Sequence, residues 1–121
     1  MSMSFPDAPE APRQARHWLE DAIAGSEHAR LHDELMLLVS ELVTNAVRYT
    51  SDDVGVTVYL HECGVWVSVA DDGAGRVEMR HADLTDTSGR GLEILDAMSS
   101  SWGVIPERVG KSVWFELADA H

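Results

Sequence analysis

Two kinds of residue are scarce in this sequence: cysteine and the basic residues. One cysteine, Cys63, in 121 residues excludes an internal disulfide and fits a reducing compartment. Nine Lys and Arg stand against 21 Asp and Glu, which gives a formal net charge of −12. A chain this acidic is poorly suited to the phosphate backbone, so we expect no nucleic acid among its partners.

Long hydrophobic runs are missing as well. No stretch approaches the roughly 18 consecutive apolar residues of a membrane span, and the first residues have no basic region followed by an apolar one. We therefore expect a cytoplasmic protein without a membrane partner. Its length suits one domain over residues 9–121, with residues 1–8 as a loose arm.

The apolar residues that are present change their spacing along the chain. They recur at helical spacing over 9–24 and 29–49, which predicts two amphipathic helices. Valines then alternate with other residues over 54–60 and 65–70, which predicts two strands joined as a hairpin. The segment 71–88 has no periodicity and collects Gly, Asp and Arg, which suggests a binding loop or lid.

The remaining segments complete an α/β pattern. A third helix is expected over 91–99, followed by short strands over 101–104 and 112–117. This order predicts a two-layer α/β sandwich, with about three helices on one face of a mixed, mostly antiparallel sheet.

The strand residues also predict a contact surface. The residues expected to face the helices are Val56, Val58, Val67, Val113 and Phe115. Tyr59, Trp66 and Trp114 then lie on the opposite face of the sheet. Three aromatic side chains on an uncovered face mark an interface, so we expect a homodimer or a partner contact there.

Three polar residues share one edge of the second predicted helix. Glu41 and Asn45 are about 40° apart around the axis, and Arg48 falls within about 20° of Glu41. A carboxylate and an amide oxygen one turn apart can hold a metal ion, position a water or accept a proton. The ordinary alternative for this spacing is a solvated polar edge with a Glu–Arg contact.

Asp71 ends a predicted strand and is followed by Gly73 and Gly75. The glycines let the backbone approach a flat ligand, and the carboxylate can accept a hydrogen bond from an amino group such as that of adenine. An Asp-Gly turn without a ligand explains the same residues.

The run Gly89, Arg90, Gly91 and Leu92 stands around the start of the third predicted helix. Backbone N–H groups at the positive end of a helix, beside an arginine, form an anion site. A Ser N-cap followed by flexible glycines is the alternative.

Taken in order, the runs ELVTNAVRYT, DDGAG, GRGL and GKSVWFEL resemble the GHKL (HATPase) ATP-binding proteins over about residues 10–118. Within that group the chain is most similar to the stand-alone anti-sigma-factor serine kinases and to actinomycete regulatory ATP-binding proteins. The resemblance implies ATP and Mg²⁺ as ligands.

The resemblance also implies roles for particular residues. Asn45 ligates Mg²⁺, Glu41 is the general base or orients a water, and Asp71 accepts from the adenine amino group. The other residues implied to contact the nucleotide are Arg48, Gly73, Gly75, Gly89, Arg90, Gly91 and Leu92. Ser112 is the expected substitute for a Thr that the family places near adenine, with Lys111 beside it.

The function that this resemblance implies is transcription control by a serine/threonine-protein kinase. The protein partner is a sigma factor that is sequestered, an anti-anti-sigma protein that is phosphorylated, or both. A non-catalytic, ATP-gated interaction module is the alternative. A plain ATPase is disfavoured, because 121 residues leave no room for a transducer domain.

Overall fold

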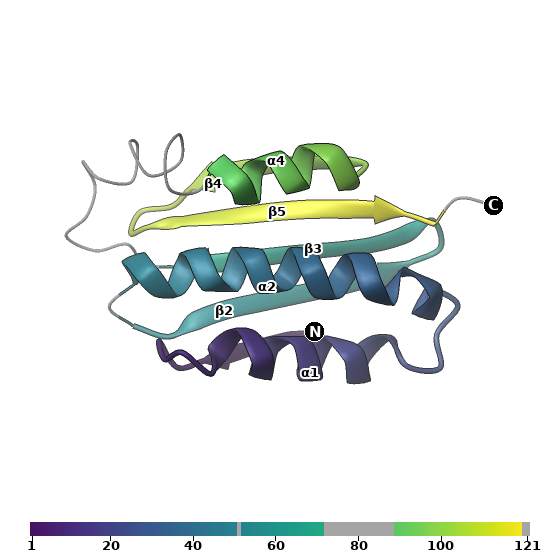
Figure 1. The fold of residues 1–121 in the computed structure, drawn as a ribbon, viewed down its shortest axis with the longest axis horizontal. Helices are drawn as coiled ribbons and strands as arrows, with labels where there is room; N and C mark the ends of the chain where they lie inside the picture. The colour runs from purple at the N-terminus through teal and green to yellow at the C-terminus, as the bar shows by residue number, and fades with distance from the viewer. Residues whose placement is uncertain (51, 72–88, 120–121) are drawn as a thin grey trace.

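The computed structural model describes residues 1–50, 52–71 and 89–119, which form one sheet with helices on one of its faces (Figure 1). A short 3₁₀ turn over Ala29–Leu31 precedes the second helix. The elements are β1 (Ser2–Phe5), α1 (Ala11–Ile23), α2 (His32–Tyr49), β2 (Val54–His61), β3 (Gly64–Asp71), α4 (Gly89–Met98), β4 (Ser101–Pro106) and β5 (Lys111–Ala118).

The strands follow the order β1-β2-β3-β5-β4, and every neighbouring pair is antiparallel. The described residues thus form three α-helices packed on a five-stranded antiparallel sheet, which confirms the two-layer sandwich. In the part of the chain that the structure describes, no helix is long and apolar enough to cross a membrane.

Residues 2–5 correct one expectation, because they are a strand and not a loose arm. β1 pairs with β2 from Ser2 opposite Thr57 to Phe5 opposite Val54. Phe5 is buried and packs edge-on against Trp18 of α1, with ring centroids 6.1 Å apart. Four residues are too few to show a periodic pattern, and their partners in β2 lie 49 to 55 residues away in the sequence.

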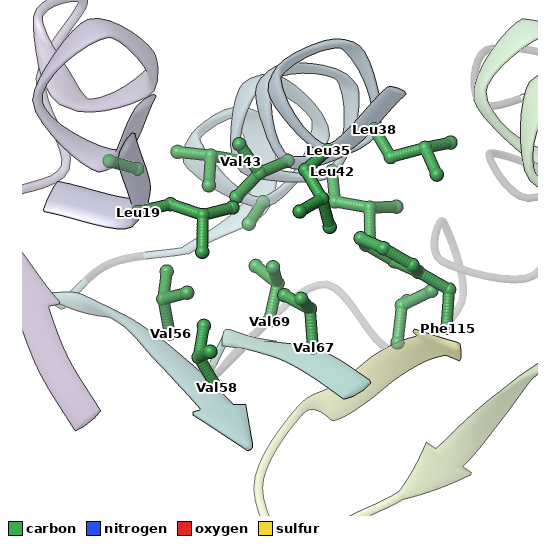
Figure 2. Packing of buried hydrophobic residues seen from close by; sticks show 14 of the residues in the cluster. Leu19, Leu35, Leu38, Leu42, Val43, Val56, Val58, Val67, Val69 and Phe115 are labelled. Atoms are coloured by element: carbon green, nitrogen blue, oxygen red, sulfur yellow. The ribbon is translucent and has the colours of Figure 1, made fainter. Parts of the chain in front are cut away.

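The core lies between the helices and the sheet (Figure 2). Leucines and valines of α1 and α2 point at the inner faces of β2, β3 and β5. The five strand residues expected to face the helices are all buried, which confirms the predicted strand faces: Val56, Val58, Val67, Val113 and Phe115. Because successive side chains of a strand point to opposite faces, these positions show which face each remaining strand residue occupies, including the residues at the strand ends.

Candidate functional site

The segments that carry the candidate site residues meet at one end of the molecule. The last turns of α2, the end of β3, the start of α4 and the start of β5 all lie at the left end of Figure 1. The register of β3 with β5 sets Asp71 opposite Lys111. The structure therefore brings together parts of the chain that are up to 70 residues apart, from Glu41 to Lys111.

The polar edge of α2 lies on the side away from α1. Figure 2 shows Leu38 on the side of α2 toward α4, above Phe115 of β5, and Val43 on the side toward Leu19 of α1. Asn45 falls within about 20° of Leu38 around the helix axis, and Glu41 within about 60°. Both side chains therefore occupy the flank of α2 that faces β5 and α4.

The surroundings of these two side chains leave their oxygens available. Glu41 and Asn45 are half-buried, and neither has a hydrogen bond or ion pair within the described residues. Arg48, one turn further along, is exposed. On the opposite flank, by contrast, the hydroxyl of Ser40 accepts a hydrogen bond of 3.0 Å from Arg16 of α1. Within the described residues, Glu41 and Asn45 thus leave their side-chain oxygens unpaired on the flank of α2 that faces β5 and α4.

Asp71 closes the sheet side of this region. It continues the inward series of β3 after Val69, and its side chain is 3% exposed. Its Oδ2 accepts a hydrogen bond of 2.9 Å from Nζ of Lys111. Its Oδ1 is buried without a hydrogen-bond partner in the described residues. Buried polar atoms are nearly always paired, so Oδ1 marks the place where a donor from a ligand fits.

Lys111, and not Ser112, is the β5 residue that meets Asp71. Successive residues of a strand point to opposite faces, so Ser112 faces away from the helices. Its hydroxyl donates to Oε2 of Glu107 at 3.0 Å. The structure therefore does not support Ser112 as the adenine contact. The strand predicted over 112–117 starts one residue after Lys111, whereas β5 includes it. Lys111 faces the helices because it is two residues from Val113, which also faces them.

The first turn of α4 consists of Gly89, Arg90, Gly91 and Leu92, two residues earlier than predicted. The backbone N–H groups of a first turn have no partner within the helix, and this turn contains no acidic residue. An anion is therefore favoured at this helix end. Gly73, Gly75 and the expected lid over residues 76–88 lie outside the described residues.

A ligand that combines a base with anionic groups fits this arrangement. An amino group on the base can donate to Oδ1 of Asp71, and anionic groups can approach the start of α4. Carboxylate and amide oxygens, such as those of Glu41 and Asn45, are the ligands that Mg²⁺ prefers. The residues present thus fit a nucleotide accompanied by a magnesium ion.

Comparison with known proteins agrees with this geometry. A search of curated proteins gave no match. The family model described as the histidine kinase-like ATPase domain matches residues 5–117, from the last residue of β1 into β5. The matched region contains α2, the end of β3 and the first turn of α4, which carry the candidate site. This chain therefore belongs to the histidine kinase-like ATPase family, the GHKL ATPases, and ATP is the ligand that its membership implies.

Proposed function

We propose that this protein is an ATP- and Mg²⁺-dependent regulatory serine kinase of the anti-sigma-factor type. It would phosphorylate an anti-anti-sigma protein, sequester a sigma factor, or do both. The observation that carries the proposal is the buried Oδ1 of Asp71, which, like Glu41 and Asn45, has no partner among the described residues. The end of β3 and the last turns of α2, which carry these residues, lie at the same end of the molecule (Figure 1).

The binding roles follow from the chemistry of each group. Asp71 takes the amino group of adenine, and the first turn of α4 takes the phosphates together with the positive charge of Arg90. Arg48 adds a second positive charge near the C-terminal end of α2. Asn45 would hold Mg²⁺ through its amide oxygen, at a place where the ion would offset the negative charge of the phosphates.

The transfer step needs one proton acceptor from the protein. The carboxylate of Glu41 takes the proton of the partner's seryl hydroxyl. The seryl oxygen then bonds to the γ-phosphorus, while the bond from that phosphorus to the bridging oxygen breaks and ADP leaves with the electron pair. Phosphoryl transfer asks little covalent chemistry of the protein, so positioning and charge supply most of the rate.

The partner surface that we propose is the face of the sheet opposite the helices. Tyr59 and Trp66 lie with ring centroids 5.5 Å apart, and Trp66 and Trp114 with centroids 6.4 Å apart. Tyr59 is 58% exposed. A row of aromatic side chains on this face favours a homodimer, and the same surface would serve the alternative function, a non-catalytic interaction module gated by ATP.

Substitutions on α2 separate binding from chemistry. We expect Asn45→Ala to weaken Mg-ATP binding by about 1–3 kcal/mol, the scale of a lost bond to a charged group. We expect Glu41→Ala to bind ATP nearly as well as the wild type while phosphate transfer falls by roughly 10²–10⁴-fold, as for a lost general base. Calorimetry with Mg-ATP, alongside phosphoserine detection on candidate partner proteins, measures both effects.

Thr44→Ala is the matched control, because Thr44 is exposed on the same helix. It should change neither affinity nor transfer. If Glu41→Ala abolished binding and Asn45→Ala did not, the two roles would be reversed or wrong. If the wild type bound Mg-ATP and modified no partner, the ATP-gated module would replace the kinase.

A further inference from the structure

A buried ion pair joins β3 to β5 at the candidate site. Nζ of Lys111 lies 2.9 Å from Oδ2 of Asp71, and the two side chains are 10% and 3% exposed. Lys111 is the only lysine in the sequence. An ammonium group loses its hydration when it is buried, so it persists there only beside a compensating charge. Asp71 provides that charge. Because both side chains are buried, the ion pair lies inside the candidate site and not on its surface.

The two oxygens of Asp71 are not equivalent toward a ligand. Oδ2 already accepts from Lys111, whereas Oδ1 is buried and unpaired among the described residues. A free carboxylate can accept two donors side by side, one on each oxygen. With Lys111 in place, Oδ1 is the one oxygen of Asp71 without a partner among the described residues, and Oδ2 already bonds to an ammonium group, which is itself a donor.

Purine bases differ in the number of donors that they present to such a group. Adenine presents a single donor group, its 6-amino group, between two ring nitrogens that accept. Guanine presents the N1–H and the 2-amino group next to each other, and these two donors require two acceptors. An unpaired donor in a buried site costs the free energy of its lost hydration.

We propose that Lys111 sets the base specificity of this site by occupying Oδ2 of Asp71. The unpaired Oδ1 accepts the one donor group of adenine, whereas the second of guanine's adjacent donors meets an oxygen that already bonds to an ammonium group. Lys111 acts here through Asp71 and is a specificity-determining residue without a part in the transfer step. The inference rests on the proposed function, because it takes Asp71 as the acceptor for the base.

The test compares GTP with ITP, which differ only in the 2-amino group. Displacement of a fluorescent ATP analogue from the full chain gives both affinities, and their ratio cancels every contact to ribose and phosphate. We expect the wild type to bind GTP no more tightly than ITP, and both less tightly than ATP. Lys111→Met frees Oδ2, so GTP should gain about tenfold relative to ITP.

Arg108→Met is the matched control, because it removes one positive charge from an exposed residue in the turn before β5. It should leave the GTP-to-ITP ratio unchanged. An equal loss of affinity for all nucleotides in Lys111→Met would mean a merely structural role and overturn the inference. Tighter binding of GTP than of ITP by the wild type would also overturn it, without depending on the folding of any variant. Failure of the wild type to bind ATP would instead overturn the proposed function itself.

Discussion

His28 lies buried at the end of the molecule opposite the candidate site. Its Nδ1 is 2.7 Å from Oδ2 of Asp119, and its Nε2 is 2.6 Å from the backbone oxygen of His61. A carboxylate and a carbonyl only accept, so both ring nitrogens carry hydrogen and the ring is an imidazolium. Arg30 adds a hydrogen bond of 2.6 Å from Nε to Oδ1 of Asp119. This cluster ties residue 119 to the segment before α2 and to the β2–β3 turn.

The cluster makes stability depend on pH. Burial alone lowers the pKa of His28, but its hydrogen bonds with Asp119 and His61 outweigh this effect, so the pKa is raised above 6.5. The raised pKa of His28 increases the free energy of unfolding, and this gain is fully present below pH 6.5. The gain is lost as the pH rises through the pKa of His28 in the folded state. We expect the urea midpoint to fall between about pH 6 and about pH 9 in the wild type, and to fall less in His28→Gln.

The acid limit of the same cluster has the opposite sign. The hydrogen bond from His28 lowers the pKa of Asp119 below 3.8, so this contribution to stability is present above pH 3.8 and is lost only as the pH falls through the lowered pKa.

His17→Gln is the control for the loss of stability at alkaline pH, because the His17 side chain is 70% exposed. Equal alkaline losses in the wild type and in His28→Gln would contradict this assignment.

Among the elements, β1 is an edge strand of four residues, and its hydrogen bonds to the sheet all go to β2. The backbone N and O of Met1 and Val58 bond to each other at 3.0 and 2.8 Å. In an antiparallel pair such bonded pairs alternate with non-bonded ones, so Met3 also bonds to its partner Val56, while the N–H of Ser4 points away from β2.

Proline substitutions in β1 should therefore have unequal effects. Met3→Pro removes a donor from the ladder and should cost about 1–3 kcal/mol of unfolding free energy. Ser4→Pro removes an outward N–H and should cost much less. Hydrogen exchange of the Val58 amide, which donates to Met1, reports the pairing directly. Met3→Ala controls for the lost side chain, and similar exchange rates in both proline variants would argue against this register.

At the scale of the whole molecule, the two faces of the sheet differ in what covers them. The helices bury one face, while Tyr59, Trp66 and Trp114 lie on the other. Trp114 lies over Gly103 of β4, where a Cβ atom would come within 2.7 Å of the indole nitrogen. This glycine lets the indole lie close against the neighbouring strand, so the aromatic row is built into the sheet.

We expect this open face to form the homodimer, and Trp66→Glu to shift the chain to a monomer by light scattering. Because each copy carries a net charge of −12, added salt should strengthen the association by screening repulsion. Thr44→Glu adds the same charge on the exposed side of α2 and should leave the dimer intact. A wild type that stays monomeric at all concentrations and salt levels would exclude this arrangement.

The sequence by itself determined the elements whose signal is local. The helical spacing of α1 and α2 and the alternation of β2, β3 and β5 reflect burial of one side of each element, which any sufficiently long segment displays in its own residues. The GHKL motifs similarly predicted which segments carry the site. They predicted Glu41 and Asn45 on one edge of α2, because that relation depends only on helix geometry.

Only the tertiary structure decided the relations between distant residues. β1 is a strand because β2 offers it an edge, and its four residues carry no pattern of their own. Asp71 and Lys111, 40 residues apart, meet because β3 and β5 pair in one register. The inward series of β5 includes Lys111 and excludes Ser112, and a shift of one residue would reverse the two. That register, set by packing across the whole sheet, decides which oxygen of Asp71 is left for a ligand.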